Sequence, residues 1–167
     1  MLVSHYSTGD MLRAEVASGS DLGCEIDGYI SKGLIVPIKI AIETITKAIK
    51  SAPTDIILLD GYPRSIEQME ALELFLKDDT ELTLEHVIEI SVSESTARER
   101  VLGRSRGADD NSEVFDNRMR VYLEPLSKIE QFYSQKNVFE KMSGEGTIDQ
   151  IVATLRVFIE SKVNKKL

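Results

Sequence analysis

Helical and strand-like patterns of apolar residues alternate along this chain. Ile38, Ile42, Ile45 and Ile49 recur at spacings of four, three and four, which predicts an amphipathic helix that begins at Pro37. Residues 56–59 form the unbroken apolar run Ile-Ile-Leu-Leu, a pattern typical of a strand buried on both faces. Residues 86–92 predict a second buried strand of the same kind.

The rest of the pattern predicts six more helices and two weaker strands. The helices are expected over residues 10–18, 22–30, 66–76, 94–104, 113–135 and 148–159, and the strands over residues 2–3 and 138–142. Thr147 followed by Gln150 matches the capping box that starts a helix. This alternation predicts an α/β fold of three layers, a parallel β-sheet flanked by helices. Because ligands of such sheets bind beyond the carboxyl ends of the strands, we expect the chemistry after Leu59 and Val92.

Composition narrows the function classes. Of the 167 residues, 42% are hydrophobic and 29% are charged, as in an ordinary globular protein. The net charge of −8 argues against a nucleic-acid polymer or a membrane surface as partner, while leaving room for a small basic cleft. No run approaches the about 18 apolar residues of a membrane span. The single cysteine, Cys24, excludes an internal disulfide, and with no apolar leader we expect a reducing, cytoplasmic setting. We expect Cys24 to be a packed small side chain.

Arginine is concentrated in one part of the chain. Six of the nine arginines fall between residues 98 and 120, where lysine is absent: Arg98, Arg100, Arg104, Arg106, Arg118 and Arg120. The planar guanidinium group binds phosphate oxygens in pairs, which favours a phosphate site. The alternative is a solvated helix face paired with nearby acidic residues, and residue types alone leave both interpretations open.

Two short segments carry further candidate chemistry. Residues 60–64, Asp-Gly-Tyr-Pro-Arg, follow a predicted buried strand directly, and an aspartate in that place can hold magnesium through water. Residues 7–13, Ser-Thr-Gly-Asp-Met-Leu-Arg, place hydroxyls and an arginine at a helix start, where backbone amides favour anions. A tight turn and an ordinary helix cap are the simpler interpretations of these two segments.

These segments occur together, in this order, in a known family. Six segments resemble the motifs of the adenylate kinases. They are residues 7–13, residues 32–37 (Lys-Gly-Leu-Ile-Val-Pro), residues 60–64 with Gln68, residues 99–104, the Asp109-Asp110-Asn111 run with Arg118, and residues 143–146. The resemblance covers essentially the whole chain. It implies a fold like that of the P-loop nucleoside triphosphate hydrolases. It also implies one domain over residues 1–167, with a nucleoside-monophosphate-binding segment at 7–36 and a short, cysteine-free lid at 103–113.

The resemblance assigns roles position by position. Thr8 and Gln68 would read the adenine of AMP, and Arg13 and Arg64 would clamp its phosphate. The rest of the AMP site would comprise Leu34, Ile35, Val36, Gly61, Tyr62, Pro63, Arg106 and Arg118. Arg104, Arg106 and Arg118 would stabilise the transferring phosphoryl group, and Arg104 and Gly146 would contact ATP. Asp60 would order magnesium-bound water, so no direct protein ligand to the metal is expected.

One family feature is missing from the sequence. The resemblance implies a first strand and a glycine-rich phosphate loop ending in Gly-Lys-Ser/Thr, and no such motif occurs here. In the family that strand lies between those corresponding to residues 56–59 and 87–92. We therefore expect two unpaired inner strand edges, each buried unpartnered backbone group costing about 1–3 kcal/mol. We expect the sequence to be an incomplete copy of such a kinase, explained by a late start-codon assignment at Met1 or by truncation.

Three functions follow as hypotheses. The first is reversible, Mg²⁺-dependent phosphoryl transfer from ATP to AMP that gives two ADP and maintains nucleotide balance, by a cytoplasmic monomer whose lid and monophosphate-binding segment close on substrate. The second is an AMP-binding module that lacks catalysis because the phosphate loop is absent. The third is a related kinase for UMP or CMP. Thr8 and Gln68 favour adenine.

Overall fold

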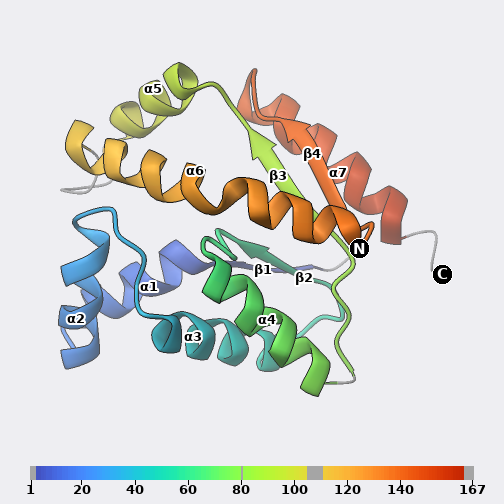
Figure 1. Cartoon of the computed structure of the whole chain (residues 1–167), viewed down its shortest axis with the longest axis horizontal. Helices are drawn as coiled ribbons and strands as arrows, with labels where there is room; N and C mark the ends of the chain where they lie inside the picture. The colour runs from blue at the N-terminus through green and yellow to red at the C-terminus, as the bar shows by residue number, and fades with distance from the viewer. Residues whose placement is uncertain (1–2, 80, 105–110, 164–167) are drawn as a thin grey trace.

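The computed structural model describes residues 3–79, 81–104 and 111–163, with Arg104 and Val163 described by backbone only. Its elements are the strands β1 (Ser4–Ser7), β2 (Ile57–Asp60), β3 (Val87–Ser91) and β4 (Phe139–Ser143), and the helices α1 (Thr8–Ala17), α2 (Asp21–Ile30), α3 (Ile38–Lys50), α4 (Ile66–Asp78), α5 (Glu94–Arg104), α6 (Ser112–Gln135) and α7 (Ile148–Val163). Parallel strands flanked by helices confirm the predicted α/β class (Figure 1). The predicted lid falls mostly on residues 105–110, outside the described residues.

The strands form two separate parallel pairs. β1 pairs with β2 from Ser4↔Ile57 to Ser7↔Asp60, and β3 pairs with β4 from Val87↔Phe139 to Ser91↔Ser143. Within the described residues no strand joins β2 to β3, so the sheet is divided where the sequence predicts unpaired edges. Figure 1 shows α3 and α4 on the side of β1 and β2, and α7 beside β4.

The divided sheet changes how deeply its strands are buried. Residues 56–59 were predicted to be buried on both faces, but each is only partly buried, and Ile90 of β3 is 39% exposed. The apolar side chains of these two runs are therefore less buried than their pattern predicts. The reason is that each pair lacks a neighbouring strand on one side within the described residues.

The first strand corrects one prediction. It was expected at residues 2–3, of which residue 2 lies outside the described residues and residue 3 is not in a strand, whereas β1 runs over Ser4–Ser7, which is polar apart from Tyr6. This segment adopts an extended backbone because it pairs with β2. A hydrogen bond from Ser4 N to Ile56 O at 2.9 Å adds to that pairing. Tertiary pairing overrides the local apolar signal here.

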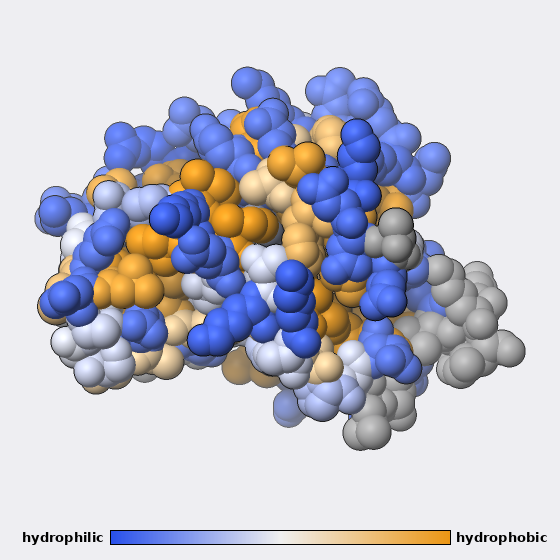
Figure 2. All heavy atoms as spheres, turned by 90° about the horizontal axis from the view of Figure 1, so that it is seen from below, coloured by the Kyte–Doolittle hydropathy of each residue, from blue (hydrophilic) through white to orange (hydrophobic). Residues whose placement is uncertain are grey.

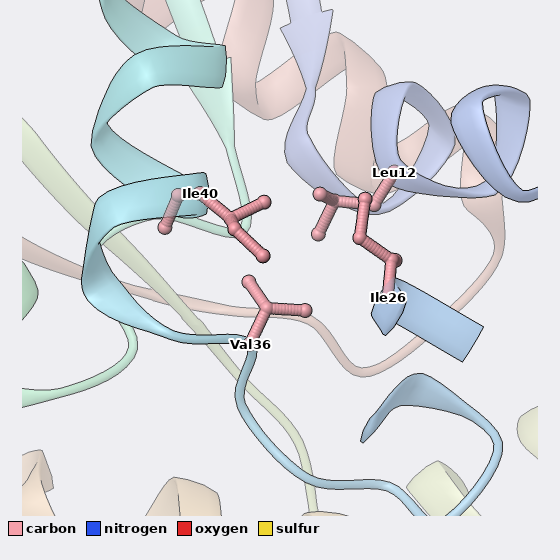
Figure 3. Close-up of a cluster of buried hydrophobic side chains, with 5 residues drawn as sticks. Leu12, Ile26, Val36 and Ile40 are labelled. Carbon is pink, nitrogen blue, oxygen red and sulfur yellow. The ribbon is translucent and has the colours of Figure 1, made fainter. Parts of the chain in front are cut away.

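Two apolar clusters form the described core. Leu12, Ile26, Val36, Ile40 and Ala41 join α1, α2 and α3, as Figure 3 shows for the labelled side chains. Met69, Ile129 and Tyr133 join α4 to α6, and α6 also contacts β4. The first cluster therefore fixes residue 36 of the turn after α2, which becomes part of the site below.

Side-chain caps begin α1 two residues before the predicted helix start and α4 at the predicted start. Ser7 Oγ accepts from Asp10 N at the start of α1, and Ser65 Oγ accepts from Gln68 N at the start of α4. The predicted capping box before α7 is confirmed, because Thr147 N donates to Gln150 Oε1 at 2.9 Å and Gln150 N donates to Thr147 Oγ1 at 3.3 Å.

The surface carries both polar and apolar side chains. Seen from the side of α3 and α4, polar side chains dominate and apolar ones gather in patches between them (Figure 2). Cys24 is exposed, so the prediction of a packed thiol is wrong. Its position on α2 faces away from the buried Gly23 and Ile26. None of the helices in the described ranges has the length and apolar content needed to cross a bilayer.

Candidate functional site

A cavity of about 810 Å³ opens where β1 and β2 end. It is lined by the start of α1, the turn after α2, the turn after β2 and one side of α6 from Phe115 to Glu130, and it continues between β2 and β3. Every described residue of the predicted AMP site lines it: Thr8, Arg13, Leu34, Ile35, Val36, Gly61, Tyr62, Pro63, Arg64, Gln68 and Arg118. Segments far apart in sequence thus meet at the carboxyl end of the strands, where the sequence predicts the chemistry.

The cavity contains the two buried polar side chains of the described residues, Thr8 and Gln68. Thr8 is the first residue of α1, is 6% exposed, and its Oγ1 has no hydrogen-bond partner among the described residues. Gln68 lies in the first turn of α4 and is 3% exposed, and its Oε1 accepts from Arg64 N at 2.7 Å. A buried hydroxyl without a partner is costly, so a polar ligand there restores a lost hydrogen bond.

Three guanidinium groups approach the same cavity. Arg13 forms an ion pair with Asp10 one turn earlier on α1, and Arg64 Nε donates to Gly61 O at 2.9 Å. Arg118 is half-buried on α6. Because these residues come from three different parts of the chain and line one cavity, they can contribute together to neutralising a bound phosphate.

The turn after β2 depends on a glycine. Gly61 has φ of 75°, and a Cβ atom built on it would lie 2.6 Å from Arg64 Nη2. Glycine both adopts this backbone conformation and leaves room for the Arg64 guanidinium. Tyr62 OH donates to Gln68 O at 3.0 Å, and burial raises the pKa of Tyr62 to about 12, so this phenol stays neutral.

Asp60 is the carboxylate at the end of β2, exposed and on the cavity wall. In the described part of the chain, His, Cys, Asp and Glu residues do not gather in groups of three or more that could hold a metal. Magnesium commonly keeps several waters and binds through one or two carboxylates and substrate phosphates. An exposed carboxylate on the cavity wall fits that mode, in which Asp60 would hold the ion through water.

The turn after α2 supplies the apolar wall. Val36 is 5% exposed and belongs to the core cluster, whereas Leu34 is 41% exposed and Ile35 is half-buried. Val36 therefore anchors the turn while its neighbours face the cavity. Such an arrangement suits the flat faces of a nucleoside.

The arginine-rich segment divides into two groups. Arg98 pairs with Asp116 and Glu94 and lies over the Phe115 ring, Arg100 donates to the carbonyls of Gly144 and Gly146, and Arg120 donates to Asn117 Oδ1. Arg98 thus pairs with acidic residues, as the solvated-face interpretation predicts, whereas Arg100 bonds to backbone carbonyls and Arg120 to an amide oxygen. Arg118 lines the cavity. The Arg104 side chain and the whole of Arg106 lie outside the described residues, so their roles stay predictions.

Gly146 is not part of the cavity wall. Its loop is held against α5, because Ser93 N donates to Glu145 Oε1 at 2.6 Å and Thr96 Oγ1 donates to Glu145 Oε2 at 2.8 Å. The hydrogen bond from Ser93 N, and then that from Thr96, lowers the pKa of Glu145. The predicted contact of Gly146 with ATP remains a prediction, made for a loop that is hydrogen-bonded to α5 and the residue before it.

One charged cluster on the cavity wall was missed by the sequence analysis. Glu89 of β3 accepts from Tyr122 OH at 2.8 Å and pairs with Lys141 Nζ at 3.0 Å, and Lys141 also pairs with Glu130 at 3.0 Å. The available signal was a charged residue inside the apolar run of residues 87–90. Its partners, however, lie 33 or more positions away.

Comparison with known proteins identifies the family. The family model described as "Adenylate kinase" matches residues 1–138. The adenylate kinase of Wolinella succinogenes is 56% identical over 161 residues, and that of Helicobacter hepaticus is 59% identical over 161 residues, each match covering 96% of this chain and 85% of the relative. The adenylate kinase of Campylobacter lari is 57% identical over 157 residues, 94% of this chain and 83% of the relative. The motifs, the cavity and these matches together show that the chain belongs to the adenylate kinases, a family of nucleoside monophosphate kinases.

Proposed function

We propose that this chain carries the AMP-binding and phosphoryl-transfer side chains of an adenylate kinase, which converts ATP and AMP to two ADP reversibly with Mg²⁺. The observation that carries the proposal is the meeting of Thr8, Gln68, Arg13, Arg64 and Arg118 on one cavity. Such an enzyme maintains the balance of adenine nucleotides. We further propose that it acts as a cytoplasmic monomer.

Base recognition falls to the two buried polar groups. The orphaned Thr8 hydroxyl and the Gln68 amide offer hydrogen bonds to the polar edge of a purine, deep in the cavity. Burying an incorrect base edge against them would leave polar atoms unpaired, which is how such sites discriminate. The apolar residues 34–36 would cover the ring and ribose.

Phosphate binding and transfer fall to the arginines. Arg13 and Arg64 would clamp the AMP phosphate, and Arg118 would neutralise charge on the group in transit, together with Arg104 and Arg106. Phosphoryl transfer requires little covalent work from the protein, so positioning and charge neutralisation carry the rate enhancement. Magnesium, held through water by Asp60, would bridge and neutralise phosphate oxygens.

Binding of the ATP phosphates requires a part that the described residues do not provide. The cavity continues between β2 and β3, whose facing edges are unpaired in the described part of the chain, and Ile148 and Val152, which share one face of α7, are 75% and 56% exposed. An unfilled strand position beside an uncovered helix face has the shape of a strand–loop–helix unit. We propose that the complete catalytic unit has a strand there, followed by a glycine-rich phosphate loop and a helix.

A comparison of nucleotide binding tests the AMP site of this proposal. AMP is titrated calorimetrically into the chain, and UMP and CMP are titrated in parallel. We expect AMP to bind more tightly than either pyrimidine nucleotide. Tighter binding of UMP or CMP would favour the related pyrimidine kinases instead, and binding of none would refute the nucleotide site.

The divided sheet favours a second candidate function. If the chain works as it stands, without a phosphate loop, it is an AMP-binding module that does not catalyse transfer. AMP binding without ATP-dependent ADP formation is the result that favours this alternative.

A further inference from the structure

The turn after α2 is fastened to α6 by a hydrogen bond outside the site described above. Asn117 Nδ2 donates to Lys32 O at 3.2 Å, joining residues 85 positions apart. Figure 1 shows the loop between α2 and α3 reaching the first turns of α6. This turn continues directly into residues 34–36 of the cavity wall.

The end of α2 explains why the Lys32 carbonyl is available. Gly33 N donates to Ile30 O and Leu34 N donates to Tyr29 O, each at 3.1 Å, with Gly33 at φ of 72°. This is the Schellman ending of a helix, in which a glycine reverses the chain. The carbonyl of Lys32 lies beyond the last helical bond of α2, so it needs a partner from elsewhere.

The approach of the two elements is close. A Cβ atom built on Gly33 would lie 2.8 Å from Val114 O and 3.2 Å from Arg118 Cγ. Any larger residue at position 33 would push the turn away from α6. The glycine therefore lets the turn sit directly against the helix that carries Arg118.

The Asn117 amide is oriented by its neighbour on the helix. Arg120 Nη2 donates to Asn117 Oδ1 at 3.2 Å, so the amide nitrogen is the atom directed at the Lys32 carbonyl. Asn117 is thus set in one orientation, ready to hold the turn, and does not itself line the cavity.

We infer that Asn117 is a positioning residue that holds the turn of residues 31–34 against α6 and so fixes the distance between the apolar cavity wall and Arg118. The inference rests on the proposed function, because the wall and Arg118 are there assigned to AMP. Releasing the hydrogen bond lets the segment move away from α6 in the ligand-free protein. Bound AMP, which contacts both sides, draws it back.

The test measures the distance between α2 and α6. Spin labels are placed on Cys24, the sole cysteine and an exposed one, and on the exposed position Gln131→Cys of α6. Asn117→Asp keeps the size and the Arg120 partner but removes the donor, and Asn117→Ala removes both. We expect the ligand-free distance distribution to broaden and lengthen in both variants and to narrow again with AMP, while the Kd for AMP rises about two- to tenfold.

The control and the outcomes separate this inference from the proposed function. Gln135→Ala, an exposed amide further along α6, should leave distances and Kd unchanged. Distances unchanged in both Asn117 variants would overturn the inference. Failure of the parent chain to bind AMP would refute the proposed function, yet the ligand-free distances would still decide whether Asn117 holds the turn. A change that AMP does not reverse would assign Asn117 a purely structural role and also overturn the inference.

Discussion

At the scale of single residues, Thr8 is the most informative position in the cavity. Its hydroxyl is buried without a partner among the described residues, although most buried polar groups in folded proteins are paired. The unpartnered hydroxyl therefore lowers the folding stability of the ligand-free protein slightly. A ligand that supplies an acceptor or donor removes that cost, so stability and binding respond to Thr8 in opposite directions.

Thr8→Val should therefore weaken AMP binding while leaving the free protein as stable or slightly more stable. Losing one hydrogen bond to the base predicts a Kd about tenfold higher. Calorimetric titration and thermal unfolding measure the two effects, with Thr83→Val at an exposed position as the control. Unchanged AMP affinity would show that Thr8 does not touch the ligand.

Gly61→Ala should damage the phosphate clamp. The new Cβ would lie 2.6 Å from Arg64 Nη2, and an alanine at φ of 75° would have a strained backbone. We expect the Kd for AMP to rise at least tenfold and the free energy of unfolding to fall by about 1 kcal/mol. The matched control is Gly28→Ala on α2, where nothing lies within 4 Å and alanine should stabilise the helix. Normal AMP binding by Gly61→Ala would contradict the role of Arg64.

Individual site residues differ in how far the sequence could predict them. Thr8, Gln68 and the AMP-site arginines belong to contiguous motifs, so their resemblance to a known pattern was visible. Glu89 and Asn117 acquire their partners only through folding, over 33 to 85 positions, and no local pattern marks such contacts. The exposure of Cys24 was missed for a similar reason, since it depends on which face of α2 packs against α1.

At the scale of elements, Glu89 links β3 to β4 and α6 through Lys141 and Tyr122. Burial alone would raise the pKa of the Glu89 carboxyl, but hydrogen bonds from side chains including Lys141 and Tyr122 outweigh burial and lower it. Burial, then the Glu89 hydrogen bond, raises the pKa of Tyr122 to about 12. The cluster is thus charged on Glu89 and neutral on Tyr122 at neutral pH.

Glu89→Gln should destabilise the protein at neutral pH and much less in acid. A carboxyl whose pKa is lowered on folding contributes stability that is fully present above its ordinary value of 4.5 and is lost as the pH falls through the lowered folded value. We expect a loss of about 1–2 kcal/mol at pH 7, shrinking below pH 4.5. Denaturant unfolding of parent and variant from pH 3 to 8 measures it, with the exposed Glu140→Gln as control. A difference that is constant with pH would contradict the charge-based explanation.

Strong periodicity predicted the helices well, and pairing decided the first strand. The isoleucines of α3 and the capping box of α7 set those elements locally. The strand Ser4–Ser7 has no such local signal, and it forms because it pairs with β2 in parallel. Element boundaries governed by caps were predictable, whereas a polar strand governed by its neighbour was not.

At the scale of the whole molecule, the division of the sheet is the dominant feature. The sequence predicted unpaired inner edges between residues 56–59 and 87–92, and the two strand pairs are separate there in the described residues. The matched 161 residues make up 85% of the Wolinella succinogenes and Helicobacter hepaticus kinases. What the sequence alone could not predict is that both halves keep their pairing and helix packing around a continuous cavity.

The most direct test of the account is a coupled assay of ADP formation from ATP and AMP with Mg²⁺. It compares the 167-residue chain with a version extended ahead of residue 1 by the proposed strand, glycine-rich phosphate loop and helix. We predict that both bind AMP, that only the extended version forms ADP, and that its unfolding is more cooperative. Rapid ADP formation by the 167-residue chain alone would contradict the account, because residues within this chain would then bind the ATP phosphates without the proposed loop.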